Sequence, residues 1–263
     1  MDNNIRAKKS LGQNFLRDIH YLEKIADAAQ VGLEDRVLEI GPGLGHLTGV
    51  LVKRAKKVLA LELDERLIPL LQQEFGSLQN IEILHADALE YAYGSLPGKW
   101  KVVANLPYYI STPIIQKLIA HRKRFVSLTL MLQKEVAVRI ASPPGNKDYG
   151  YLSVLVQLYA MPRIEFLVPP DAFTPQPEVD SAVVTLVIRE QPAVSLADEN
   201  FFIRVVKAAF SQRRKTLRNA LKQLEVPREK MQLVLSKTGI DLGRRAETLS
   251  VEEFGQLADF LGS

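Results

Sequence analysis

Polar side chains and glycines follow several apolar runs of this sequence, and the stretch VVANLPYYIS (102–111) is the most informative. Asn105 ends an apolar run and is followed by Leu106, Pro107 and Tyr108. An amide oxygen beside a backbone carbonyl oxygen offers two acceptors to the hydrogens of an exocyclic amine. Pro107 keeps the Leu106 carbonyl from being used by a helix, and the Tyr108 ring offers a face on which a base can stack. This combination predicts a site that holds an amino group and orients its nitrogen for attack.

A glycine-rich loop follows the first strongly apolar run, RVLEI (36–40). Glycines at such a point let the backbone turn sharply and approach a ligand closely, and here they are Gly41, Gly43 and Gly45. The dinucleotide fingerprint G-x-G-x-x-G would require glycine at position 46, where this chain has His46. The spacing G-x-G-x-G after the acidic Glu39 is commoner in sites for S-adenosylmethionine. On this motif alone, a loop of purely structural purpose remains open.

Two further carboxylates lie at the ends of later apolar runs. Glu62 is at the end of the run 57–63, where a carboxylate can reach a ribose diol. Asp87 follows the run 81–84 and could accept a hydrogen bond from an adenine amine, with Ala88 beside it in the same site. Either carboxylate could instead cap a following helix. Because such ligand groups gather at the carboxyl ends of parallel strands, we expect all these residues at one edge of a sheet.

The elements that must position these groups alternate along the first two-thirds of the chain, which predicts an α/β fold with a parallel sheet covered on both faces. Asp18, Asp64 and Ser111 are candidate helix N-caps. Strands are predicted at 36–40, 57–63, 81–84, 101–104, 125–132 and 181–188, and helices at 18–30, 46–54, 64–75, 111–121 and 133–141.

The pattern changes near residue 190, beyond which only helices are predicted, at 199–211, 214–224, 227–237 and 251–261. We therefore predict a first domain over 1–190 and a small all-helical domain over 191–263. Residues 201–224 contain seven Lys and Arg residues and no Asp or Glu, which favours contact with phosphate backbones. A solvated helix face is the alternative for this basic stretch.

Composition excludes several classes of site. The chain of 263 residues has no cysteine and four scattered histidines, so we expect no disulfide, no thiolate chemistry and no metal. The basic N-terminus is followed by no apolar signal region, and no stretch is long and apolar enough to span a bilayer. We expect a cytoplasmic protein that does not associate with membranes.

Long segments of the chain resemble one family, the small-subunit ribosomal RNA adenine dimethyltransferases. NLPY (105–108) is similar to the amine-binding box of amino-methyltransferases, and the other matching segments are KSLGQNFL (9–16), EIGPGLG (39–45), FTPQPEVDSAV (173–183), FSQRRKTLRNAL (210–221) and RAETLSVEEF (245–254). The resemblance implies a Rossmann-like class I methyltransferase sheet that uses S-adenosylmethionine, followed by a helical RNA-binding domain.

The resemblance also implies roles that the residue pattern does not give. Gln13, Asn14 and Leu16 would contact the cofactor, together with Gly41, Gly43, Glu62, Asp87, Ala88 and Asn105. Phe173 would hold an extruded adenine against Tyr108, although a core position for Phe173 remains open. Arg213, Arg214, Lys215 and Arg218 would bind the RNA backbone. The implied substrate is a pair of adjacent adenosines in a hairpin loop near the 3′ end of 16S rRNA, within an immature 30S particle, and the implied enzyme is a monomer.

Three alternatives stay open on sequence. The related large-subunit (23S) rRNA adenine methyltransferases that confer macrolide resistance share the glycine loop and the helical domain, but NLPYY and the C-terminal segments favour the small-subunit type. The chain could act chiefly as a ribosome-assembly factor, with methyl transfer secondary. A DNA adenine methyltransferase is the third and weakest alternative.

Overall fold

The computed structural model describes residues 7–8, 11–212 and 214–263, which pack as two compact units. The first unit comprises residues 1–137 and 163–188, and the second comprises residues 138–162 and 189–263. The boundary between 188 and 189 is close to the domain boundary predicted at residue 190. Residues 138–162 pack with the C-terminal unit, a grouping that no sequence pattern indicated. The assignment of one function to each unit stays a prediction.

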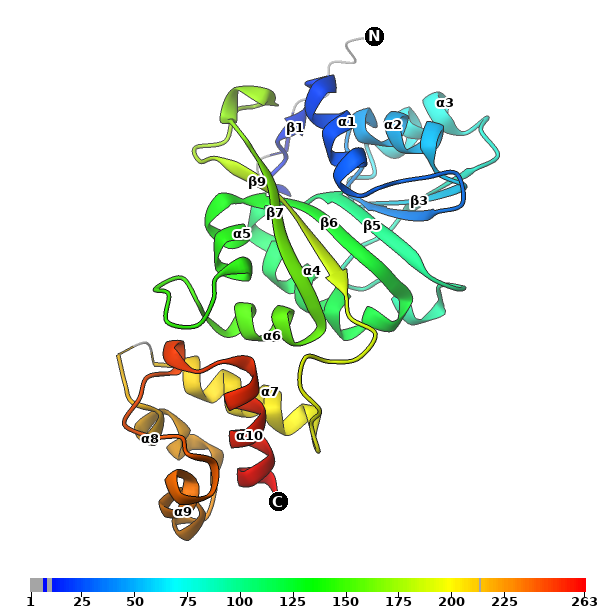
Figure 1. Cartoon of the computed structure of the whole chain (residues 1–263). Helices are drawn as coiled ribbons and strands as arrows, with labels where there is room; N and C mark the ends of the chain where they lie inside the picture. Colours follow the sequence, from blue (N-terminus) through cyan, green and yellow to red (C-terminus); the bar gives the residue numbers. More distant parts are fainter. Residues whose placement is uncertain (1–6, 9–10, 213) are drawn as a thin grey trace. The chain divides into compact units, whose positions relative to one another are not determined.

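A seven-stranded sheet in the order β4-β3-β2-β5-β6-β9-β7 forms the centre of the fold (Figure 1). All six predicted strands are present, and the pairs β2–β3, β3–β4, β2–β5 and β5–β6 are parallel. β9 lies between β6 and β7 and runs antiparallel to β6, so the expectation of a parallel sheet does not hold for this strand. The strands are β2 (Arg36–Ile40), β3 (Lys57–Glu62), β4 (Ile81–His85), β5 (Trp100–Asn105), β6 (Phe125–Gln133), β7 (Ala160–Val168) and β9 (Ser181–Ile188).

Both faces of the sheet are buried. On one face, apolar residues of α1 and α2 form a cluster with Val37, Val103 and Met131 of the strands. Residues that point to the other face, such as Leu38 and Leu128, are also fully buried, because side chains alternate along each strand. The helices are α1 (Ile19–Ala28), α2 (His46–Arg54), α3 (Ile68–Phe75), α4 (Ser111–Ala120), α5 (Lys134–Ala141) and α6 (Tyr151–Tyr159).

Only one of the three predicted N-caps caps a helix. The Asp18 side chain accepts a hydrogen bond from the His20 N–H at 2.9 Å and so satisfies one of the free donors at the start of α1. Ser111 is the first residue of α4, and α3 begins at residue 68, beyond the reach of Asp64. The side chain of Asp64 is used differently, as described below.

A two-stranded ribbon joins the N-terminal segment to a later loop. β1 (Phe15–Leu16) pairs antiparallel with β8 (Phe173–Thr174), which places Leu16 opposite Phe173. The pairing is too short and too distant in sequence to be read from periodicity. It fixes the segment before residue 16 next to the glycine loop. Short 3-10 turns complete the fold at Tyr93–Ser95 (η2), Tyr108–Ile110 (η3), Arg122–Arg124 (η4), Pro170–Ala172 (η5), Leu221–Leu224 (η6) and Ala246–Thr248 (η7).

The C-terminal unit is helical, as predicted. Its helices are α7 (Glu199–Phe210), α8 (Leu217–Ala220), α9 (Arg228–Thr238) and α10 (Val251–Gly262), with α6 packed beside α7. The Phe210 ring lies between Tyr149 and Phe254, with ring centroids 6.1 and 5.8 Å apart. None of the described helices of the chain combines the length and the apolar character that a membrane crossing requires.

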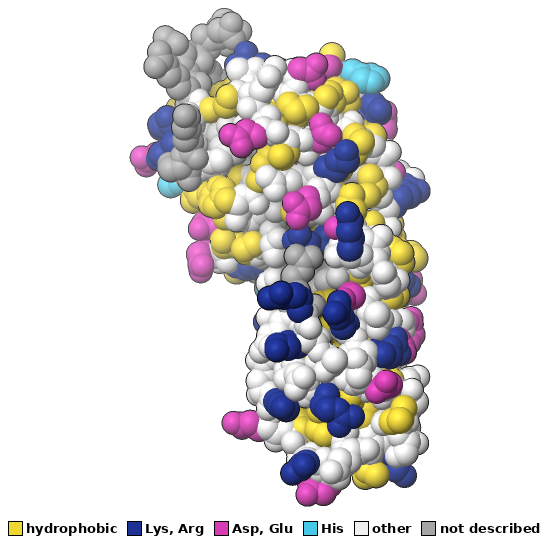
Figure 2. Space-filling model, turned by 90° about the vertical axis from the view of Figure 1, so that its left-hand side faces the viewer, with side chains coloured by type: hydrophobic (Ala, Val, Ile, Leu, Met, Phe, Trp, Pro, Cys, Tyr) yellow, Lys and Arg dark blue, Asp and Glu magenta, His cyan; other side chains and the backbone are white. Residues whose placement is uncertain are grey.

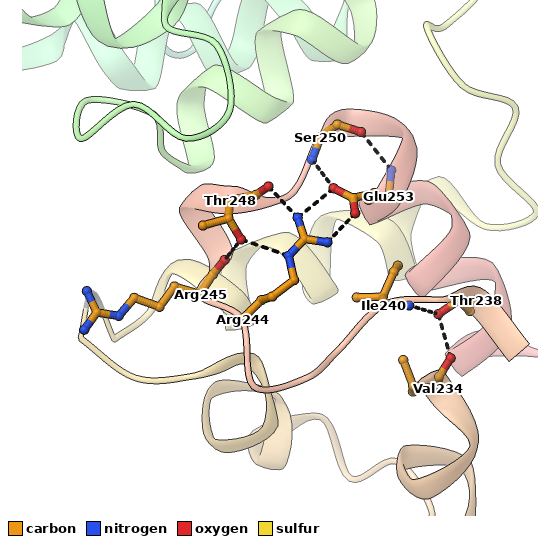
Figure 3. A network of polar contacts seen from close by, with 8 residues as sticks. All are labelled: Val234, Thr238, Ile240, Arg244, Arg245, Thr248, Ser250 and Glu253. Carbon is orange, nitrogen blue, oxygen red and sulfur yellow. Dashed lines mark hydrogen bonds and ion pairs between the residues drawn. The ribbon is translucent and has the colours of Figure 1, made fainter. Parts of the chain in front are cut away.

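A polar network orders the loop before α10 (Figure 3). The guanidinium of Arg244 forms a two-pronged ion pair with Glu253 and donates to the Thr248 carbonyl at 2.6 Å. Glu253 and Ser250 also form a capping box, in which each side chain accepts from the other residue's backbone N–H. The guanidinium of Arg245 points away from this network (Figure 3), and 57% of its side chain is exposed.

Candidate active site

The predicted cofactor-binding and amine-binding residues other than Phe173 line one pocket at the carboxyl ends of the parallel strands. The glycine loop follows β2, Glu62 ends β3, Asp87 follows β4 and Asn105 ends β5. The residues that line the pocket include Gln13, Asn14, Leu16, Gly41, Gly43, Glu62, Asp87, Ala88, Asn105, Leu106, Pro107 and Tyr108. Parallel strand pairing brings these positions together, because all the strand ends face the same edge.

The glycine loop needs its glycines for conformation and for space. Gly43 has φ 60°, and a Cβ at this position would lie 3.2 Å from the ring of Phe15. Gly45 has φ 83°, and a Cβ there would lie 2.6 Å from the ring of Phe75. Both positions therefore exclude larger residues. The Gly43 N–H is free to donate to a carboxylate across the loop, and it does so to Glu62.

Glu62 is held at both oxygens by backbone donors. Oε2 accepts from the Gly43 N–H at 3.0 Å, and Oε1 accepts from the Asp64 N–H at 2.8 Å. Burial raises the pKa of Glu62, whereas these two hydrogen bonds lower it. Each oxygen still has acceptor capacity, because a carboxylate has about four lone-pair directions. The two bonds thus orient the group and leave it able to accept from a ligand.

Asp87 stabilises a turn and also lies on the pocket wall, while its bond to an adenine amine stays a prediction. Its Oδ1 accepts from the Leu89 N–H at 2.7 Å and stabilises the turn after β4, and the residue also lines the pocket. The neighbouring Ala88 is buried, and its carbonyl accepts from the Tyr93 hydroxyl at 2.8 Å. Ala88 therefore contributes its small side chain and its position to the pocket wall.

The orientation of Asn105 is set by a residue 91 positions away. Its Nδ2 donates to the carbonyl oxygen of Asn14 at 3.1 Å. A carbonyl only accepts, so the nitrogen must face Asn14 and the oxygen Oδ1 remains for another donor. The Leu106 N–H donates to the Met131 carbonyl at 3.2 Å, which anchors the next peptide on β6. Pro107, with φ −57° and ψ 131°, then begins the turn η3.

Tyr108 is a neutral ring on the pocket wall. Its hydroxyl lies 2.6 Å from Ser181 Oγ, at the start of β9. Burial raises the pKa of Tyr108, and the hydrogen bond with Ser181 partly offsets this. The hydroxyl is therefore protonated at physiological pH and is no general base. What Tyr108 offers a ligand is its ring face.

Phe173 is not brought to the pocket wall. The side chain is 3% exposed and packs in the apolar cluster with Leu16, Val168 and Val183. This is the core position that the sequence left open. Contact of Phe173 with a bound base stays a prediction.

The segment 11–16 lies along the pocket and is attached by side chains from three elements. Gln13 donates to Asp64 after β3, the Asn14 carbonyl accepts from Asn105, and the Leu16 carbonyl lies 3.0 Å from Nδ1 of His46 at the start of α2. Leu16 itself is 4% exposed and belongs to the core cluster as well as to the pocket wall. The segment therefore lines the pocket, and its contact with a cofactor, which the family resemblance implies, stays a prediction.

The pocket is acidic. Glu39, Glu62 and Asp87 line it, whereas its described lining residues include no Lys or Arg. Glu39 is 1% exposed and accepts from Thr48 Oγ1 at 2.7 Å. Such a pocket suits a ligand with hydroxyl, amine or cationic groups and disfavours a phosphorylated dinucleotide, which needs positive charge or free N–H donors. No group of three or more metal-binding side chains occurs in the part of the chain that the structure describes.

The predicted RNA-binding residues lie in the C-terminal unit. Arg214, Lys215 and Arg218 are exposed, the first two between α7 and α8 and the third within α8, whereas Arg213 lies outside the described residues. Figure 2 shows Lys and Arg side chains spread over one face of this unit, with fewer acidic side chains among them. The positive face agrees with either a phosphate-binding surface or a solvated one.

Residues 4–262 match the model of the family described as "Ribosomal RNA adenine dimethylase". The chain belongs to the ribosomal RNA adenine dimethylase family. A protein named ribosomal RNA small subunit methyltransferase A from Clostridium acetobutylicum is 48% identical over 259 residues, which cover 97% of this chain and 94% of that protein. The family match confirms the resemblance that the sequence motifs indicated.

Solved structures agree with the family assignment. A dimethyladenosine transferase from Plasmodium falciparum has a TM-score of 0.80 and 30% identity, over 92% of this chain and 95% of the other. The 23S rRNA methyltransferase ErmE has a TM-score of 0.73 and 28% identity, over 95% of this chain and 100% of the ErmE chain. Both similarities confirm the Rossmann-like α/β fold, and the small-subunit relatives are closer in sequence than ErmE.

Sequence reasoning missed several residues of this dimethylase pocket. His46 was noted only as a departure from a fingerprint, and Glu39 only as an acidic neighbour, yet both line the pocket. Tyr109, the second tyrosine of NLPYY, also lines it with a side chain that is 56% exposed. These residues are adjacent in sequence to the recognised motifs, and this adjacency could have identified them as pocket residues. Asp64 was assigned to a helix cap and gave no sign of its actual contacts.

Proposed function

We propose that this protein transfers methyl groups from S-adenosylmethionine to N6 of two adjacent adenosines in a hairpin loop near the 3′ end of 16S rRNA, giving N6,N6-dimethyladenosine. The observation that carries the proposal is the fixed Asn105 amide: its Nδ2 is held by the Asn14 carbonyl, which leaves Oδ1 for a ligand in the pocket that Leu106 also lines. Membership in the dimethylase family and 48% identity to small-subunit methyltransferases support this choice over the 23S alternative.

The chemistry of the pocket residues fits S-adenosylmethionine. This ligand carries a cationic sulfonium, an ammonium group, a ribose diol and an adenine amine, and a pocket lined by Glu62 and Asp87 but by no described Lys or Arg suits that set. Glu62 would accept from the ribose hydroxyls, Asp87 from the adenine amine, and the glycine loop would allow close backbone approach. When bound, the cofactor supplies an electrophilic methyl group.

The amine-binding residues would prepare the nucleophile. Asn105 Oδ1 and the Leu106 carbonyl accept the two N6 hydrogens, which directs the nitrogen lone pair out of conjugation with the ring. Tyr108 stacks against the base and restricts its rotation. A general base is unnecessary, because the nitrogen loses its proton to water after it has become cationic. Orientation and electrostatic fit therefore supply most of the acceleration.

The RNA-binding surface would be the basic face of the C-terminal unit. Arg214, Lys215 and Arg218 would contact phosphates, together with Arg213, and would recognise helix shape more than base sequence. We propose that the enzyme acts as a monomer on an immature 30S particle, and hence in the cytoplasm.

Methylation of defined particles tests this proposal. Purified protein and labelled S-adenosylmethionine are incubated with 30S particles from cells that lack the gene, with 23S rRNA and with DNA. We expect label only in 16S rRNA, and mass spectrometry should identify two adjacent dimethyladenosines. Label confined to 23S rRNA or to DNA would contradict the proposal.

A further inference from the structure

Asp64 is a buried carboxylate that stands behind the pocket. Its relative exposure is 3%, and it is absent from the residues that line the cavity. It nevertheless contacts two residues that do line it, Gln13 and Glu62. A buried charge is costly unless its acceptor sites are filled, so the contacts of Asp64 show what the fold gains from it.

The side chain of Asp64 fixes the amide of Gln13. Gln13 Nε2 donates to Asp64 Oδ2 at 2.9 Å, while Gln13 Oε1 accepts from the Lys8 N–H at 2.7 Å. The amide cannot be reversed, because reversal would place an acceptor against the carboxylate and a donor against the Lys8 N–H. Both ends of the Gln13 amide are thus committed within the protein. Gln13 therefore acts as a strut for the segment 11–16.

The remaining acceptor sites of Asp64 are filled by Arg66. The guanidinium donates from Nε to Oδ1 at 2.8 Å and from Nη2 to Oδ2 at 2.5 Å. The hydrogen bonds from Arg66 lower the pKa of Asp64 to about 2, and Gln13 adds to this against the opposing effect of burial. The carboxylate is consequently charged at any physiological pH. The backbone N–H of Arg66 also donates to Oδ1, at 3.3 Å, so four donors surround the carboxylate and strongly determine its position.

The backbone of Asp64 acts on the opposite side. Its N–H donates to Glu62 Oε1 at 2.8 Å, the bond that orients the Glu62 carboxylate in the pocket. One residue therefore sets the position of the segment 11–16 through its side chain and the direction of Glu62 through its main chain. The bonds to Gln13 and Glu62 are independent, since a change of side chain leaves the N–H in place.

We propose that Asp64 is a positioning residue for the cofactor site, which holds the segment 11–16 closed along the pocket through Gln13. The binding test of this inference rests on the proposed function, the use of S-adenosylmethionine. The test on the ligand-free protein does not depend on it. Asp64 touches no ligand itself. When only the side chain is changed, the N–H that holds Glu62 stays in place, and the effect on the segment 11–16 passes through Gln13.

The Asp64→Asn variant keeps the shape and the backbone N–H but brings an amide N–H₂ towards the donors of Gln13 and Arg66. At least one donor then loses its acceptor, and the segment 11–16 loosens. The matched control is Glu65→Gln, which removes the same charge from an exposed neighbour. Arg66→Gln is a second control, because it removes the ion pair and leaves the bond to Gln13.

Amide hydrogen exchange on the ligand-free protein is the first measurement. We expect Asp64→Asn to raise the exchange rates of segment 11–16 at least about tenfold, while Glu65→Gln leaves them unchanged and Arg66→Gln changes them by less than about threefold. Gln13→Ala removes the bond to Asp64 from the other partner and changes no charge. It should loosen the same segment to the same degree. Unchanged exchange in both Asp64→Asn and Gln13→Ala would overturn the inference.

Cofactor affinity is the second measurement. Asp64→Asn should raise the dissociation constant for S-adenosylmethionine about tenfold and its KM in parallel, with kcat changed less than about twofold. Gln13→Ala should weaken binding equally, and the double variant should be no weaker than either single one. Additive losses would refute the route through Gln13. If the wild-type protein binds no S-adenosylmethionine, the proposed function fails, whereas the exchange result still decides the role of Asp64.

Discussion

Replacement of Glu39 by glutamine removes a carboxyl group that the folded protein buries and keeps protonated at neutral pH. Glu39 is 1% exposed, and burial raises its pKa from 4.5 to about 8. The hydrogen bond from Thr48 lowers this pKa, and the negative charge of Glu62 raises it further. Glutamine has nearly the same shape as the protonated acid, and its amide oxygen can still accept from Thr48. The variant therefore isolates the free energy linked to this one proton.

The direction of the effect follows from proton linkage. Between pH 4.5 and about 8 the folded state retains a proton that the unfolded state has lost, so the free energy of unfolding falls as pH rises through this window. At about 1.4 kcal/mol for each pH unit, the full window corresponds to roughly 4 to 5 kcal/mol. Glu39→Gln should match the wild type in stability near pH 4.5 and exceed it by several kcal/mol at pH 8.

Urea unfolding of the ligand-free protein at half-unit pH steps measures this difference. The only tryptophan, Trp100, lies in β5 and is 2% exposed, so its fluorescence reports on the sheet that carries Glu39. The control Glu34→Gln changes a side chain that is 88% exposed and should follow the wild type at every pH. If the curves of Glu39→Gln and the wild type stay parallel from pH 5 to 8, the assignment of a buried, protonated Glu39 is refuted.

Three further substitutions test the site. Asn105→Ala should lower kcat about 10²- to 10³-fold, while the dissociation constant of S-adenosylmethionine, measured by calorimetry, changes less than it does in Glu62→Ala; the opposite ranking would reverse the roles given to these residues. Tyr108→Phe keeps the ring and should keep kcat within about threefold, whereas Tyr108→Ala should lose roughly 1 to 3 kcal/mol of RNA binding. If single-turnover assays show equal losses for the two variants, the hydroxyl and not the ring face is the important group. The double variant Arg214→Glu, Lys215→Glu should weaken particle binding. The slope of log K against log salt concentration should fall by about one unit for each lost phosphate contact. Binding that is unchanged at every salt concentration would show that this face is only a solvated surface.

The amino-acid sequence by itself determined the strand and helix pattern and the positions of the chemical groups on it. Six strands form within one or two residues of their predicted bounds, because continuous apolar runs are a local property of the chain. Once those runs pair in parallel, the glycine loop, Glu62, Asp87 and Asn105 must share an edge. Membership in the dimethylase family was also readable, since its motifs are contiguous.

Tertiary structure alone decided which partner each of these groups has. The bonds of Gln13 to Asp64 and of Asn14 to Asn105 join residues 51 and 91 positions apart, and no periodicity encodes such pairs. The raised pKa of Glu39 depends on the apolar layers that fold over it, and the core position of Phe173 depends on the short ribbon with β1. Sequence patterns report which face of an element is buried, whereas hydrogen-bond partners and desolvation depend on what the completed fold places opposite it.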